Sequence, residues 1–183
     1  MTQHEASSAA GAGGNRKSFG KPARSVNAAK TKGLSKRGAA RLAAVQALYQ
    51  MELTDNDAET IVLEFTTHRF GESAEAAVFR LVDKGLFADI VRGVARHEEY
   101  DDMIAGALSE DWAIDRLDSV LRATLRAATF ELSERLDVPL QVIISEYVDI
   151  AHAFFTGREP AIVNGVLDSI GRVLRQEEAE RKR

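Results

Sequence analysis

The sequence predicts an all-α protein of about seven helices, preceded by a disordered basic arm. Three observations carry this prediction. From residue 34 onward, apolar residues recur at steps of three and four, which is the helical period. Pro139 and Pro160 stand where helices can begin, because the first helical turn has no partner for the N–H that proline lacks. No segment alternates with period two over a convincing length, and 183 residues suit one compact domain with appendages.

The first helix is expected to begin after Ser35, whose hydroxyl can cap its N-terminus. A turn rich in aspartate and asparagine at residues 55–57 separates this helix from the second. The periodic apolar residues place the first four helices at about residues 35–53, 61–71, 74–97 and 100–108.

A long helix is expected over about residues 115–136, where leucines and an alanine recur at steps of four, four, three and four. The sixth helix follows Pro139, and Gly157 can adopt the left-handed conformation that closes it. The seventh helix follows Pro160. We therefore expect three domain segments: an arm at residues 1–33, a helical domain at 34–175 and a charged tail at 176–183.

The net charge of −4 conceals a strong asymmetry along the chain. Residues 1–41 contain nine Lys and Arg and one acid, so they carry +8, and the remainder carries −12. Residues 1–33 contain few large apolar side chains and cannot bury enough surface to order themselves. A basic arm on an acidic body is typical of a segment that meets polyanions, although a solubilising tail is an equally open interpretation.

Composition also excludes several classes of chemistry. The chain has no cysteine, which rules out disulfides, thiol nucleophiles and thiolate metal sites. The four histidines fall on different predicted segments without metal-ligand spacing, and no hydrolase or zincin motif is present. No apolar run approaches the roughly 18 residues that span a bilayer, and no secretory signal is evident. We expect a cytoplasmic, membrane-free binding protein that is not an enzyme and uses no metal or cofactor.

The start of the first helix carries the pattern that points to binding. Arg37 and Arg41 lie four residues apart and are expected on one helix face, flanked by Lys36. A helix N-terminus carries partial positive charge, so a basic start favours an anionic ligand such as phosphate. Gln46 and Tyr49 follow one or two turns later, and this combination suits single-stranded nucleic acid. Tyr49 is equally compatible with a core ring whose hydroxyl is exposed.

The same helix start resembles that of the NusB family of bacterial transcription antitermination factors. Order and spacing match over about residues 35–174. The stretches that carry the resemblance are Arg37-x-x-x-Arg41-x-x-Ala44-Val45-Gln46-Ala47-Leu48-Tyr49, Arg126-Ala127-Ala128-Thr129-Phe130-Glu131-Leu132, Asp137-Val138-Pro139, Ile144-Ser145-Glu146 and Ile162-Val163-Asn164-Gly165-Val166-Leu167-Asp168.

The resemblance implies an all-α fold of two packed helical halves and a role in RNA binding. It implies pairing with NusE, a ribosomal protein of the small subunit, on the single-stranded boxA element of nascent transcripts. That complex joins RNA polymerase and suppresses premature termination in ribosomal RNA operons. The free protein is expected to be a monomer or a homodimer.

The resemblance also implies particular RNA contacts. On matching positions, it assigns RNA contact to Arg37, Arg41 and Tyr49, with a second side formed by Phe154 and the region from Arg158 to Ile162. Lys36 and Gln46 are added from the local geometry of the helix. The expected RNA-binding residues are therefore Lys36, Arg37, Arg41, Gln46, Tyr49, Phe154, Arg158 and Ile162.

Some alternatives stay open at this point. Asn164 and Gly165 are expected to serve helix packing in preference to RNA contact. The whole chain is also compatible with a helical scaffold that binds a basic protein, or with an accessory module of an RNA methyltransferase. Neither of those alternatives requires RNA affinity of the chain itself.

Overall fold

The computed structural model describes residues 33–70, 82–109, 112–176 and 178. Those residues form an all-α fold, which confirms the predicted class. The helices are α1 (Lys36–Thr54), α2 (Ala58–Glu64), α3 (Lys84–Arg96), α4 (Glu99–Ala107), α5 (Ser119–Glu134), α6 (Leu140–Phe154) and α7 (Glu159–Leu174), with a π-helical turn at Phe65–Arg69 and a 3-10 turn at Ile114–Arg116. The expected arm, residues 1–33, lies outside the described residues except for Gly33.

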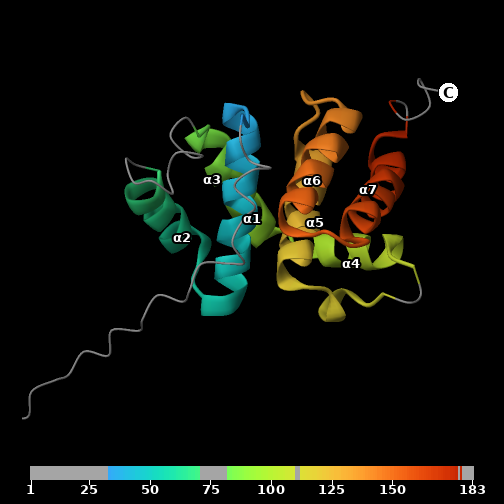
Figure 1. Ribbon diagram of the computed structural model, residues 1–183, viewed down its shortest axis with the longest axis horizontal. Coiled ribbons are helices and arrows are strands. Elements are labelled where there is room, and N and C mark those ends of the chain that lie inside the picture. Colours follow the sequence, from blue (N-terminus) through green and yellow to red (C-terminus); the bar gives the residue numbers. More distant parts are fainter. Residues whose placement is uncertain (1–32, 71–81, 110–111, 177, 179–183) are drawn as a thin grey trace, which may run out of the picture.

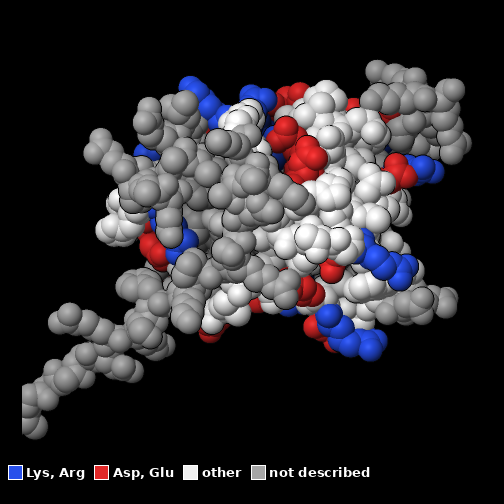
Figure 2. Space-filling view, viewed as in Figure 1, with Lys and Arg blue, Asp and Glu red and all other residues white. Residues whose placement is uncertain are grey.

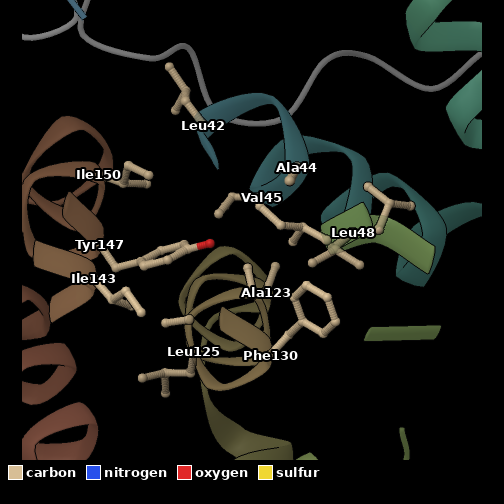
Figure 3. Packing of buried hydrophobic residues seen from close by; sticks show 14 of the residues in the cluster. Leu42, Ala44, Val45, Leu48, Ala123, Leu125, Phe130, Ile143, Tyr147 and Ile150 are labelled. Atoms are coloured by element: carbon tan, nitrogen blue, oxygen red, sulfur yellow. The ribbon is translucent and has the colours of Figure 1, made fainter. Parts of the chain in front are cut away.

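The helices pack as two halves, as the resemblance implied. α1, α2 and α3 form one half, and α4 to α7 form the other (Figure 1). The halves meet mainly where α1 packs against α5, with α3 also contacting α5. Small buried side chains such as Ala44 of α1 and Ala123 of α5 lie in this seam and let the two helices approach closely (Figure 3).

α1 and α5 run in opposite directions along the seam. Near one end Arg41 bonds Glu131 of α5, and near the other Glu52 bonds Arg122 of α5. Because α6 returns antiparallel to α5 after a short turn, α1 and α6 run in the same direction (Figure 1). This orientation decides which candidate site residues share an end of the molecule.

Most predicted helix boundaries lie within a few residues of the observed ones, and two differ for clear reasons. The third helix begins at Lys84, because the Asp83 side chain accepts a hydrogen bond from the Leu86 N–H and caps the helix there. The part of that predicted helix before Val82 lies outside the described residues. Gly157 was expected to be left-handed, but the only glycine with positive φ in the described ranges is Gly33. Glycine at position 157 instead provides room, since a Cβ would lie 2.7 Å from Glu159 Oε2.

The C-terminal end of α7 is anchored to the body of the fold. The Arg175 side chain is 4% exposed and donates to four backbone carbonyls at the end of α5 and in the α5–α6 turn. Glu178 accepts the Leu140 N–H at 2.7 Å and thereby caps α6. Glu178 lies in the expected charged tail, yet this residue contacts the folded domain.

Candidate nucleic-acid interface

The predicted cap and basic start of α1 are present in the structure. Ser35 Oγ accepts a hydrogen bond from the Gly38 N–H at 2.9 Å, so α1 begins directly after it. Lys36 and Arg37 occupy the first turn and are exposed. Arg37 lies near the α5–α6 turn, where its positive charge contributes to lowering the pKa of Asp137, whose main partner is Arg135. These two cations are available to an anionic ligand.

Arg41 does not share that exposed surface, so the expectation that it projects beside Arg37 is wrong. Its side chain is 3% exposed. Its Nε and one terminal nitrogen donate to the two oxygens of Glu131 at 2.8 and 2.9 Å, and the other terminal nitrogen donates to Glu146 at 3.0 Å. A spacing of four residues places two side chains on one helix face. Along that face of α1, the position of Arg37 is exposed to solvent and the position of Arg41, one turn later, is buried between the two halves.

Arg41 belongs to a buried network that joins α1, α5 and α6. The Glu131 side chain is fully buried and also accepts a hydrogen bond from the Tyr147 hydroxyl at 2.8 Å. Figure 3 shows the Tyr147 ring reaching from α6 toward the space between α1 and α5. Burial opposes the charge on Arg41, but the bonds and charge of Glu131 outweigh it, so the pKa of Arg41 lies above its ordinary value. Burial, reinforced by the charge of Glu131, raises the pKa of Tyr147 well above its ordinary value.

The same network supplies an anion to the start of α1. Gly38 lies so close to Glu146 that a Cβ built on the glycine would lie 3.2 Å from Glu146 Oε2. Figure 2 shows acidic atoms at the surface between the upper parts of α1 and α6, with basic atoms above α1. α1 has no acid in its own first turn, and this carboxylate from α6 partly complements its positive end. The basic helix start therefore does not by itself require a bound phosphate, as the sequence argument assumed.

The remaining predicted residues lie further along α1 and around the α6–α7 turn. Tyr49 and Phe154 are each half-buried against the core, with part of each ring accessible. Arg41 and Glu146 are bonded to each other; Tyr49 lies eight residues after Arg41 on α1, and Phe154 lies eight residues after Glu146 on α6. Each interval corresponds to about 12 Å along the helix. Since α1 and α6 run in the same direction, the two rings lie at a similar level. Tyr49 thus combines the two interpretations left open, a ring packed on the core with an accessible edge.

The other members of the expected second side are also partly accessible. Gln46 and Ile162 are half-buried, and Arg158 is exposed at the residue that precedes α7. The expected residues therefore do not converge in one pocket. They extend from the first turn of α1 to the start of α7, an arrangement that suits an extended strand more than a compact ligand.

Asn164 and Gly165 do not serve helix packing. Both are exposed on α7, and a Cβ on Gly165 would meet nothing within 4 Å. The packing interpretation preferred for them is wrong, because these positions fall on the solvent side of α7 while Val163, Val166 and Leu167 face the core.

Sequence reasoning missed Glu131, Glu146 and Tyr147, which organise the start of α1. They lie 90 to 106 residues after Arg41, so no local spacing connects them. Within the described ranges, no group of three or more His, Cys, Asp or Glu residues could hold a metal ion. Among the same residues, no helix has the length and apolar character needed to cross a membrane.

Comparisons with known proteins identify the family. The NusB family model matches residues 38–172. The transcription antitermination protein NusB of Sinorhizobium fredii (strain NBRC 101917 / NGR234) is 52% identical over 144 residues, which cover 78% of this chain and 90% of the relative. The NusB protein of Sinorhizobium medicae (strain WSM419) is 49% identical over 148 residues, covering 80% and 92%.

A solved structure agrees with these sequence matches. The structure titled "T. maritima NusB, P3121, Form 2" superposes with a TM-score of 0.63 at 32% identity, over 80% of this chain and 98% of that one. The residues that the family model matches, 38–172, extend from the first turn of α1 to the last turn of α7. The chain belongs to the NusB family.

Proposed function

We propose that this chain is an RNA-binding transcription antitermination factor without a catalytic role. In this role it pairs with NusE, a small-subunit ribosomal protein, on boxA-type single-stranded RNA. The resulting complex with RNA polymerase suppresses premature termination in ribosomal RNA operons. The observation that carries the proposal is 52% identity to a transcription antitermination protein over nearly the full length of that relative.

The geometry supports an extended RNA path along α1 and across the α6–α7 turn. Lys36, Arg37 and Arg158 are exposed cations that can hold phosphates. The accessible parts of Tyr49 and Phe154 can stack on unpaired bases, a contact worth roughly 1–3 kcal/mol per base. Gln46 and Ile162 are half-buried side chains that can line the path between these groups. Arg41 takes part as a positioning residue, because its guanidinium is engaged by Glu131 and Glu146.

The test is binding of a boxA-type RNA to the full chain, with and without NusE, at several salt concentrations. Three phosphate-binding side chains give a log–log salt slope of about −2 for a single strand. Affinity should then fall by roughly 20-fold between 50 and 200 mM salt. Replacing Arg37 with alanine should reduce the magnitude of the slope by about 0.7 and leave the helical circular dichroism unchanged.

A matched control is Arg116→Ala, which removes an exposed arginine in the 3-10 turn before α5. That variant should keep the wild-type slope. Binding that does not respond to salt would contradict phosphate contact. Binding of NusE with no added RNA affinity would select the scaffold interpretation, and co-purification with a methyltransferase subunit would select the accessory module.

A further inference from the structure

We propose that Glu146 reads a base: at one position of the bound strand it selects a base with an exocyclic amino group and discriminates against uracil. The proposal rests on the proposed RNA-binding function and assigns a specificity-determining residue to that site. Glu146 is not among the residues that the basic and aromatic patterns predicted, since a carboxylate is unexpected on a surface that meets a polyanion.

The position of Glu146 places it beside the proposed RNA path. Its side chain is 33% exposed, between α1 and α6. Glu146 Oε2 packs against Gly38 in the first turn of α1, next to the exposed Arg37. Tyr49 lies about 12 Å further along the same helix, eight residues beyond Arg41. A strand that uses both Arg37 and Tyr49 passes the Glu146 carboxylate.

The carboxylate is held in one orientation by a chain of buried bonds. Oε2 accepts from the Arg41 guanidinium at 3.0 Å, and Arg41 is fixed by two bonds to the fully buried Glu131. The Tyr147 hydroxyl fixes Glu131 in turn. Within the described residues, no hydrogen bond reaches Glu146 Oε1. Oε1 is therefore a pre-oriented acceptor on a half-exposed side chain, and little entropy is lost when it binds a donor.

The chemistry of this acceptor determines which bases it favours. A carboxylate oxygen only accepts hydrogen bonds, and adenine, cytosine and guanine each offer an exocyclic amino donor. The single N–H of uracil lies between two carbonyl oxygens, which repel a carboxylate that approaches it. Phosphate oxygens are also repelled, so Glu146 turns the strand with a base edge toward itself and its phosphates toward Lys36 and Arg37.

Proximity to positive groups makes a carboxylate tolerable at this place. Arg41 and the N-terminal end of α1 both offset the negative charge of Glu146. An exposed acid without these neighbours, such as Asp149 one turn later on α6, would only weaken RNA binding. Asp149 therefore provides a control for the change in net charge.

The experiment measures the Kd of a boxA-type RNA in the presence of NusE, with each adenosine, cytidine or guanosine replaced by uridine one at a time. For the wild-type chain we expect one position at which uridine weakens binding on the order of tenfold. In Glu146→Gln, the amide oxygen can accept from Arg41 and the amide nitrogen then faces the strand as a donor. The penalty at that position should disappear or reverse, while the other positions keep their wild-type values.

The Asp149→Asn variant carries the same charge change and should keep the uridine penalty. If Glu146→Gln fails to fold, Glu146→Asp keeps the charge but withdraws the carboxylate, and should reduce the penalty at the same position. The inference is overturned if the wild type binds RNA with the expected salt slope but every variant shows the same base profile. It is also overturned if Glu146→Gln weakens all RNAs equally. Absence of RNA binding by the wild type would instead overturn the proposed function.

Discussion

The exchange of Arg41 for methionine separates a buried structural role from a direct RNA contact. Methionine keeps the apolar stem but leaves the Glu131 carboxylate, which is fully buried, with the Tyr147 hydroxyl as its remaining side-chain donor among the described residues. Removing one partner of a buried ion pair costs about 3–5 kcal/mol, because the remaining charge is desolvated without compensation. That is a large part of a total stability of roughly 5–15 kcal/mol.

Urea unfolding followed by circular dichroism measures this loss. With a slope of roughly 2 kcal/mol per M, the midpoint should fall by about 2 M. A second exchange, Glu131→Gln, should recover part of the loss in the double variant, because it removes the unpaired charge. Arg37→Ala is the matched control, and since Arg37 is exposed its free energy of unfolding should change by no more than about 0.5 kcal/mol.

The two roles differ in the combination of stability and salt dependence. A folded Arg41→Met protein at low temperature should keep the wild-type salt slope of RNA binding, whereas Arg37→Ala should reduce it. The reasoning is refuted if Arg41→Met has the urea midpoint of the wild type and its RNA binding depends less on salt than that of the wild type. That result would mean that Arg41 leaves the network and contacts phosphate.

Three further predictions concern the packing, hydrogen bonds and ion pairs that hold the helices together. Gly93→Ala should destabilise the protein by about 1–3 kcal/mol in urea unfolding, because the added Cβ would lie 2.0 Å from the Phe130 ring. In the double variant, the smaller side chain of Phe130→Leu should restore part of the loss. An unchanged urea midpoint for Gly93→Ala would contradict the close contact between α3 and α5. Arg175→Met should cost at least about 3 kcal/mol, since four backbone carbonyls lose their donor and three of these bonds are buried. A thermal scan with unaltered unfolding would contradict this role. Burial opposes ionisation of Glu52, but Arg122 outweighs burial and lowers the pKa of Glu52 below its ordinary value of 4.5. The Glu52 carboxylate therefore stabilises the fold above about pH 4.5, and this stabilisation is lost as the pH falls through the folded pKa. The difference in free energy of unfolding between wild type and Glu52→Gln should shrink below about pH 4.5, and a constant difference would refute the ion pair.

Local patterns predicted the helices well because each one depends on neighbours within a few residues. The hydroxyl of Ser35 and the apolar period of α1 are sufficient to place that helix. Where prediction failed, the cause was a partner outside the pattern. Asp83 caps α3 later than periodicity suggested, and Gly157 lies against the side chain of Glu159 without a left-handed backbone.

The candidate site was predicted less completely for the same reason. Lys36 and Arg37 could be recognised from the basic start of a helix, and both are exposed. The burial of Arg41 could not be recognised, since it depends on where α5 and α6 cross α1. Glu146 could not be identified as a member of the site either, because the contact between Glu146 and Arg41 spans 105 residues.

The amino-acid sequence alone determined the helical class, the order of the seven helices and the separation of a basic arm from an acidic body. These properties follow from side-chain periodicity, capping and net charge, which act along the chain. Only the tertiary structure decided that one of two arginines spaced for the same helix face is exposed while the other is locked between two carboxylates. That outcome depends on the crossing of α1 with α5 and α6, because burial and electrostatic pairing are set by which helices meet in space.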